Sequence, residues 1–221
     1  VSFSPEDGDS LDELLRKADM AMYEAKRKQQ DIALYSEDLE LKTKQTADIE
    51  KELRHALKRN EFSMVYQPQI DTLSNEVLGL EALIRWHNAA LGFVPPDQFI
   101  TIAEANGSIH AIGQFVIETA LSECIDVCRK IPKRTIKLRI SVNVSVRQLL
   151  SEGFIENLIV TLDKYDRQAI TFMIEVTESL FIEDLSRAKS ILDLANKSGI
   201  DVSLDDFGTG YSSLSALSKL P

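Results

Sequence analysis

The chain has 221 residues, of which 44% are hydrophobic and 27% are charged. That hydrophobic fraction allows a packed core and excludes wholesale disorder. The formal net charge of −10 argues against binding along the backbone of DNA or RNA, which requires a basic surface. Two cysteines are too few for a disulfide framework, and no apolar run approaches the ~20 residues that span a bilayer. We expect an acidic, cytoplasmic protein.

The first 60 residues carry two different helical patterns. After a candidate Ser N-cap, apolar residues recur every three or four positions, which predicts a helix over about 10–28 and then a short strand at 32–35. Because one helix and one strand cannot bury a core, we expect 1–39 to be the remnant of a domain that begins upstream. The Lys- and Glu-rich stretch 40–60 keeps one apolar helical face and is predicted to be a linker helix leading to a domain at 61–221.

From residue 61 onward the apolar pattern changes from helical to extended. Alternating residues predict a hairpin over 62–86, with turn residues between its two strands. Strands and helices then alternate, which indicates a parallel sheet with right-handed crossovers. In chain order we expect a helical region at 96–130, a strand at 136–144, a helix at 147–165, a strand at 170–176, a helix at 184–198 and a strand at 201–205, which makes five strands.

Acidic and amide side chains stand near the carboxyl ends of four predicted strands. They are Glu81, Asn143, Glu175 and the adjacent pair Asp205 and Asp206. The last three of these strands follow one another at intervals of about 30 residues, roughly one strand–helix unit, so they should present these groups at the same sheet edge. In a (β/α)8 barrel that edge carries the chemistry. An all-oxygen set suits Mg²⁺ or Mn²⁺, and two such ions commonly clamp a phosphodiester during cleavage. The alternative is a set of buried hydrogen-bonding residues that order the strand ends.

Two further polar residues allow two interpretations each. Arg85 lies four residues after Glu81 and therefore on the same strand face, where it would suit a phosphate oxygen. The alternative for Arg85 is a charge partner for Glu81. Gln67 either contacts a ligand or hydrogen-bonds a strand end.

Several short motifs follow one another in a specific order. Glu81-Ala82-Leu83 stands within the run Gly79–Trp86 and is preceded by Tyr66-Gln67-Pro68. Downstream come Pro95–Ile100, Val142–Ser145, Ile174–Glu178 and Asp205–Leu214. In kind and in order these motifs resemble the EAL family of cyclic di-GMP phosphodiesterases. The tripeptide alone is common in helices, whereas the ordered set is specific.

This resemblance implies an α/β fold, a TIM-like (β/α)8 barrel with an antiparallel first strand, incomplete in this chain. It also implies hydrolysis of cyclic di-GMP to linear pGpG with two Mg²⁺ or Mn²⁺ ions. The implied metal ligands are Glu81, Asn143, Glu175 and Asp205, with Asp206 at the second ion; Glu81, Asp205 and Asp206 are the implied catalytic residues. The implied substrate contacts are Gln67 at the guanine edge, Leu83, and Arg85 at the phosphate. Glu178 would hold the Asp-Asp-Phe-Gly loop, which takes part in dimer coupling.

Residues 1–39 resemble the tail of a GGDEF diguanylate cyclase domain, through Pro5–Gly8 and Leu14–Tyr23. The cyclase signature lies outside the chain, so nothing in it supports cyclase activity. Both ends look cut, since a complete barrel takes about 250 residues and the family places a Lys, a Glu ligand and a Gln further on. We therefore expect a GGDEF domain in cis, a homodimer through the EAL domain, any membrane tether upstream, and little hydrolysis by these residues alone. A non-catalytic cyclic di-GMP receptor and a purely structural remnant are the alternatives.

Overall fold

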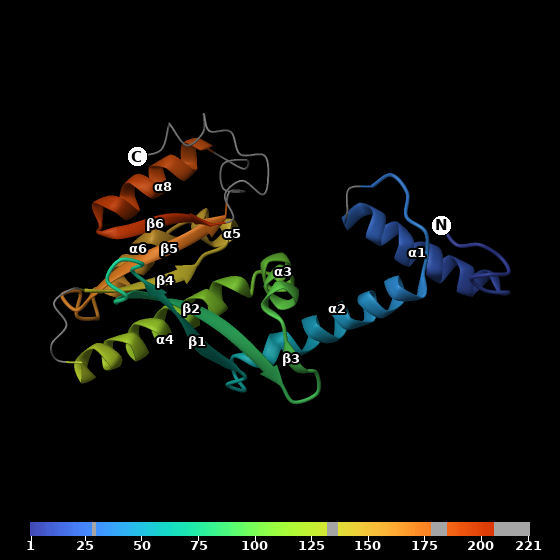
Figure 1. The fold of residues 1–221 in the computed structure, drawn as a ribbon. Coiled ribbons are helices and arrows are strands. Elements are labelled where there is room, and N and C mark those ends of the chain that lie inside the picture. Colours follow the sequence, from blue (N-terminus) through green and yellow to red (C-terminus); the bar gives the residue numbers. More distant parts are fainter. Residues whose placement is uncertain (28–29, 132–136, 178–184, 206–221) are drawn as a thin grey trace. The chain divides into compact units, whose positions relative to one another are not determined.

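The computed structural model describes residues 1–27, 30–131, 137–177 and 185–205. The chain divides into two compact units, Val1–His55 and Ala56–Pro221, called here the small unit and the large unit (Figure 1). Among the described residues, no helix is both long enough and apolar enough to cross a membrane.

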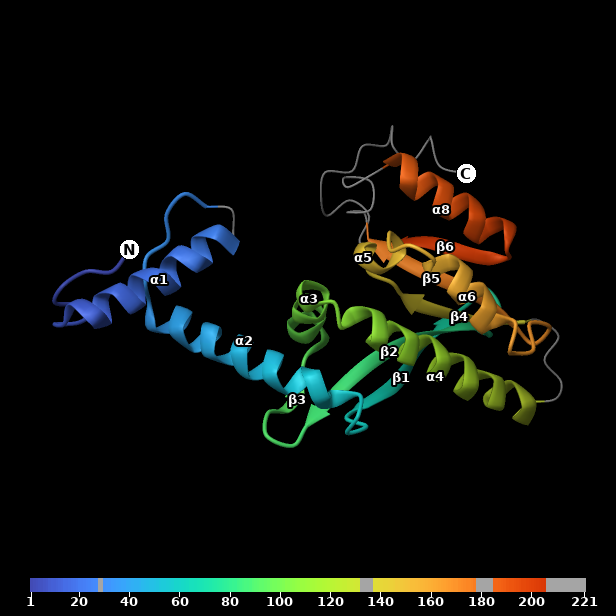
Figure 2. The same cartoon turned by 180° about the vertical axis from the view of Figure 1, so that it is seen from behind.

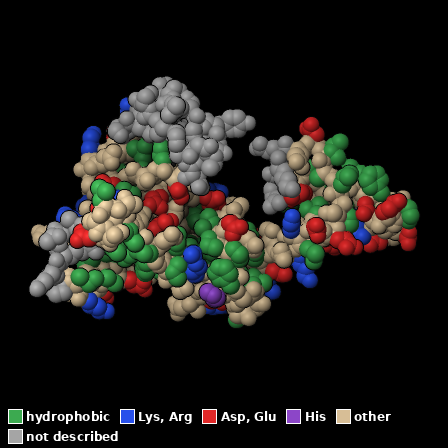
Figure 3. All heavy atoms as spheres, viewed as in Figure 1, with side chains coloured by type: hydrophobic (Ala, Val, Ile, Leu, Met, Phe, Trp, Pro, Cys, Tyr) green, Lys and Arg blue, Asp and Glu red, His purple; other side chains and the backbone are tan. Residues whose placement is uncertain are grey.

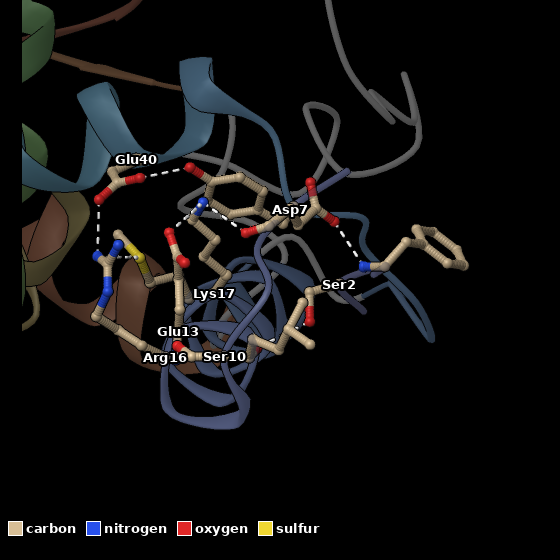
Figure 4. A network of polar contacts seen from close by, with 11 residues as sticks. Ser2, Asp7, Ser10, Glu13, Arg16, Lys17 and Glu40 are labelled. Carbon is tan, nitrogen blue, oxygen red and sulfur yellow. Dashed lines mark hydrogen bonds and ion pairs between the residues drawn. The ribbon is translucent and has the colours of Figure 1, made fainter. Parts of the chain in front are cut away.

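The small unit consists of α1 (Leu11–Arg27) and most of α2 (Glu37–Ala56). Polar contacts join α1 to the start of α2 (Figure 4). Glu40 accepts a hydrogen bond from the Tyr35 hydroxyl and forms an ion pair of 2.7 Å with Arg16, and these two contacts lower the pKa of Glu40. The Lys17 ammonium lies 4.9 Å from the centre of the Tyr35 ring, a cation–π contact. Side chains on two helices and on the segment between them therefore fix one arrangement of this unit.

The expected strand at 32–35 is wrong, because residues 30–35 are described and are irregular. Several apolar side chains of this unit are exposed, including Leu11, Leu15 and Tyr23 on α1. Figure 3 shows hydrophobic side chains (green) among acidic ones (red) on the face of the small unit that is in view.

The large unit contains one sheet in the order β1-β2-β4-β5-β6, with β3 paired to the end of β2. Its elements are β1 (Phe62–Ile70), β2 (Val77–Asn88), β3 (Gly92–Val94), α3 (Pro96–Asn106), α4 (Ile109–Lys130), β4 (Leu138–Asn143), α5 (Val146–Leu149), α6 (Phe154–Leu162), β5 (Ile170–Thr177), α8 (Leu185–Lys197) and β6 (Ile200–Asp205). β1 is antiparallel to β2, whereas β2, β4, β5 and β6 are parallel. The antiparallel first strand and the parallel sheet are confirmed, and the sheet formed by the described residues is open.

Two local expectations, the number of strands and the helix at 147–165, need correction, and the helical region at 96–130 is confirmed. The described sheet has six strands, because the three-residue β3 pairs with β2 from Trp86 to Asn88 and is too short to show a periodic pattern. The helical region expected at 96–130 is two helices, divided at Gly107, whose φ of 82° belongs to the left-handed region that glycine adopts without strain. The helix expected at 147–165 is likewise two helices, α5 and α6.

The side chains of the sheet separate into an apolar face and a polar face. Every second residue of β4 and β5 is buried, for example Ile140, Val142, Phe172 and Ile174. Helices α4, α6 and α8 cover this apolar face, as the view from behind shows (Figure 2). Because directly paired residues share a side of the sheet, the register assigns the polar face: it carries Gln67, Gln69, Glu81, Leu83, Arg85, Arg139, Ser141, Asn143, Glu175 and Asp205.

An aromatic cluster closes the apolar side of the hairpin. The Trp86 ring lies 5.5 Å from that of Phe99 in an edge-to-face arrangement and 5.8 Å from that of Phe62. The indole N–H of Trp86 donates a hydrogen bond of 2.9 Å to Glu61, whose carboxylate also accepts one of 3.0 Å from Asn88. Burial by itself raises the pKa of Glu61, but these hydrogen bonds and the Arg59 guanidinium outweigh it, and the pKa falls below the ordinary value.

Replacing Glu61 by Ala should lower the free energy of unfolding by about 2 kcal/mol at pH 7, because the fully buried indole N–H of Trp86 loses its acceptor. A carboxylate with a lowered pKa contributes stability above the ordinary Glu pKa, and this contribution is lost as pH falls through the folded-state value. The difference between wild type and Glu61→Ala should therefore shrink in acid. Urea unfolding followed by the fluorescence of Trp86, the single tryptophan, measures this difference. The exposed Glu156→Ala on α6 is the control, and equal stability of wild type and Glu61→Ala at pH 7 would contradict the assignment.

Candidate functional site

The sheet register brings four predicted site residues to one face. Asn143 pairs directly with Glu175, and Glu81 pairs with Ser141, two residues before Asn143. Asp205 pairs with Thr177, two residues after Glu175. Because alternate residues of a strand share a face, Glu81, Asn143, Glu175 and Asp205 all lie on the polar face, toward the carboxyl ends of the parallel strands.

The side chains of this set interact directly. The Asn143 amide donates a hydrogen bond of 2.9 Å to Glu81 Oε1. Glu175 is partly buried and accepts hydrogen bonds from Ser141 and from Gln69. Its pKa is nevertheless raised, first by burial and then by the negative charge of Glu81, with a further contribution from Asp205. The negative charges of Glu81 and Asp205 therefore oppose the ionisation of Glu175 at this edge.

The donor chemistry of the edge fits a hard divalent cation. Carboxylate oxygens and one amide oxygen are the ligands that Mg²⁺ and Mn²⁺ prefer, and a cation would remove the repulsion that raises the pKa of Glu175. In the described part of the chain, no three Asp, Glu, His or Cys side chains yet stand close enough together to enclose an ion. The set fits such an ion by the chemistry of its donors.

The three residues expected to contact substrate share the same face. Gln67 on β1 stands directly opposite Glu81 across the antiparallel pair. Leu83 follows Glu81 by two residues on β2 and is partly exposed. Arg85 lies two residues further on, and its guanidinium donates a hydrogen bond of 2.9 Å to the Ile84 carbonyl. The ion pairs found among the described residues do not include one between Arg85 and Glu81.

A cavity of about 510 Å³ opens beside the carboxylates. Its lining includes Asn143 and Glu175 of the sheet together with Ile100 and Glu104 of α3. Ser145 and Gln148 also line it, and they form a capping box at the start of α5. In this box the Ser145 hydroxyl accepts a hydrogen bond from the backbone N–H of Gln148, and the Gln148 side chain accepts one from the backbone N–H of Ser145. This box fixes the backbone directly after Asn143.

The family model described as the EAL domain matches residues 50–221. The chain belongs to the EAL family.

Two curated relatives match the whole of the chain. The cyclic di-GMP phosphodiesterase PdeR of Escherichia coli K12 is 36% identical over 225 residues, which cover all of this chain and 33% of PdeR. The signaling protein YkoW of Bacillus subtilis 168 is 36% identical over 223 residues, which cover all of this chain and 27% of YkoW. The chain thus spans at most about a third of the length of these two relatives.

Solved EAL structures agree with the fold. The PaMucR phosphodiesterase in complex with c-di-GMP is 32% identical and superposes with a TM-score of 0.69, over 79% of this chain and 69% of that one. The cAMP-bound EAL enzyme Bd1971 is 26% identical with a TM-score of 0.72, over 98% of this chain and 55% of that one. These structures bear out the expected fold class, with its TIM-like barrel sheet.

Sequence reasoning missed a second layer of the site in this EAL domain. Gln69, Arg139 and Ser141 lie on the polar face, although no motif includes them. Gln69 and Ser141 hydrogen-bond Glu175, and Arg139 hydrogen-bonds Gln69. The signal that could have found them is strand alternation, since Gln69 follows Gln67 by two residues and Ser141 precedes Asn143 by two. Asp206 and Glu178, two other predicted site residues, lie outside the described residues.

Proposed function

We propose that this EAL domain hydrolyses cyclic di-GMP to linear pGpG with Mg²⁺ or Mn²⁺, in bacterial second-messenger signalling by the full-length protein. The observation that carries the proposal is the register that assembles Glu81, Asn143, Glu175 and Asp205 at one edge of one sheet face. The relative PdeR, named as a cyclic di-GMP phosphodiesterase, supports the same assignment.

The proposed metal ligands are Glu81, Asn143, Glu175 and Asp205, and Asp206 serves a second ion. Bound there, a pair of divalent ions would activate water and neutralise charge on the phosphate during cleavage. The hydrogen bond from Asn143 to Glu81 holds these two donors side by side across neighbouring strands. The proposed catalytic residues Glu81, Asp205 and Asp206 belong to this metal-binding set.

The remaining predicted residues hold the substrate in this proposal. Gln67 lies opposite Glu81 and offers both a donor and an acceptor to a guanine edge. Arg85 stands beyond Glu81 on the same face, where its guanidinium can hold a phosphate oxygen in two-point contact. Leu83 lies between Glu81 and Arg85 on the same face of β2 and supplies an apolar contact to the substrate. Glu178 is proposed to hold the Asp-Asp-Phe-Gly loop.

Turnover and binding, measured on the same full-length preparation, test the function. Conversion of cyclic di-GMP to pGpG is followed by chromatography with Mn²⁺, and nucleotide binding is followed by calorimetry with Ca²⁺, which occupies oxygen sites. Mn²⁺-dependent hydrolysis is the expected result. Binding without hydrolysis would replace this proposal by the alternative, a non-catalytic cyclic di-GMP receptor, and the absence of both would overturn it.

The organisation of the protein around this domain is also a proposal. We propose that residues 1–39 are the tail of a GGDEF domain joined in cis by a linker over 40–60, because the EAL model begins only at residue 50 while relatives match the whole chain. The helix in this linker is α2, which begins at Glu37 and ends at Ala56, earlier than the expected residue 60. A homodimer through the EAL domain and a cytoplasmic location complete the proposal. Low cysteine content supports the location.

A further inference from the structure

We infer that Gln69, itself held by Arg139, positions the Glu175 carboxylate and thereby sets the affinity of the metal site. This inference rests on the proposed function insofar as Glu175 is taken as a metal ligand. Gln69 belongs to no motif of the sequence, and it acts through Glu175 rather than on substrate, which makes it a positioning residue.

The backbone places Gln69 where only a long side chain can reach the site. It lies near the end of β1, opposite Gly79 of β2, on the polar face. Glu175 belongs to β5, and β2 and β4 separate it from β1. The Gln69 side chain passes above Gly79 of β2, and its Nε2 lies 3.4 Å from Ser141 Oγ on β4 and 3.4 Å from Glu175 Oε1.

Gly79 provides the space for this crossing. A Cβ atom at position 79 would lie 2.8 Å from Gln69 Oε1 and 2.9 Å from the Arg139 carbonyl oxygen, both closer than real Cβ atoms approach. The absence of a side chain on β2 therefore opens a passage from β1 toward β5. The glycine within the motif-bearing strand thus has a steric role at the site.

Arg139 determines which end of the Gln69 amide faces Glu175. Its Nε donates a hydrogen bond of 3.1 Å to Gln69 Oε1. Arginine has only hydrogen-bond donors, and an ionised carboxylate has only acceptors. If the Gln69 amide were reversed, its N–H groups would face the Arg139 N–H, and its oxygen would face the Glu175 carboxylate. The amide oxygen therefore faces Arg139, and the amide nitrogen is left to hold Glu175. Arg139 therefore orients the Glu175 carboxylate through Gln69, without contacting that carboxylate itself.

Such outer partners of a metal ligand commonly change affinity about tenfold to a hundredfold when they are removed. We therefore expect Gln69→Met, which keeps the length and removes the hydrogen bonds to Glu175, Ser141 and Arg139, to weaken Mn²⁺ binding at least about tenfold in calorimetric titration of the full-length protein. The matched control is Gln67→Met, the same change on the same strand and face. It should weaken cyclic di-GMP binding while Mn²⁺ affinity stays within about twofold of wild type.

A double-mutant cycle identifies the chain of contacts. Arg139→Met should also weaken Mn²⁺ binding, and Gln69→Met combined with Arg139→Met should be no weaker than Gln69→Met alone, because Arg139 acts through Gln69. Circular dichroism and thermal unfolding verify that each variant is folded. If Gln69→Met misfolds, Arg139→Met carries the test by itself.

The two proposals can fail separately. Wild-type Mn²⁺ affinity retained in folded Gln69→Met and Arg139→Met overturns the positioning role, whatever the activity. Mn²⁺ binding that depends on Gln69 in a protein that does not hydrolyse cyclic di-GMP supports the positioning role and overturns the hydrolase. A wild-type protein that binds no Mn²⁺ overturns both.

Discussion

Glu81→Gln should reduce Mn²⁺-dependent hydrolysis of cyclic di-GMP by the full-length protein about a thousandfold. Glutamine keeps an oxygen that can accept the hydrogen bond from Asn143, so the local fold should persist. It removes the negative charge that holds the ion, and loss of several kcal/mol of charge stabilisation in the transition state corresponds to about three orders of magnitude in rate. Initial rates of pGpG formation at saturating Mn²⁺ measure the effect.

The matched control is Glu156→Gln on α6, the same chemical change at an exposed position. It should leave the rate within about twofold of wild type. Melting temperatures of the two variants show whether either has lost structure. Unchanged turnover by Glu81→Gln would remove Glu81 from the metal-binding set.

Gly79→Ala should lower the free energy of unfolding by about 2 kcal/mol, although alanine is the better residue inside a strand. The new methyl group would lie 2.9 Å from the carbonyl oxygen of Arg139 and 3.0 Å from the Cβ of Arg139. These atoms belong to the directly paired residue of β4 and cannot move without disturbing the β2–β4 ladder. Urea unfolding followed by circular dichroism measures the loss.

Ser63→Ala, at an exposed position on the polar side of β1, is the surface control and should change stability by less than about 0.5 kcal/mol. Adding Gln69→Ala to Gly79→Ala separates the two clashes. Shortening Gln69 frees the methyl group from Oε1 but leaves the backbone of Arg139 in its way. Most of the destabilisation should therefore persist in the double variant, and full recovery would show that the side chain alone is crowded.

Local patterns in the sequence determined much of this fold. Period-two alternation predicted the hairpin β1–β2, and the alternation of strands and helices predicted that β2, β4, β5 and β6 run parallel. These features could be predicted because burial of one sheet face imposes its period on the sequence. Short elements could not, since β3 has three residues and α5 has four, which is less than one period of evidence.

The candidate site was also predicted only in part from the sequence. Acidic and amide side chains at the ends of predicted strands pointed to Glu81, Asn143, Glu175 and Asp205, and the motif order pointed to the EAL family. Only the tertiary structure decided which strands are neighbours and in what register they pair. For example, the direct pairing of Asn143 with Glu175 brings together residues from separate strand–helix units.

The layer around Glu175 depended wholly on tertiary structure. Gln69 and Glu175 are 106 residues apart in the chain, and their contact requires three strand pairings and a passage above Gly79. A sequence pattern records the side of a strand on which a residue lies, because that side is set by local alternation. It does not record which distant side chain crosses to meet it, because that contact follows from register and from the space that neighbouring residues leave open.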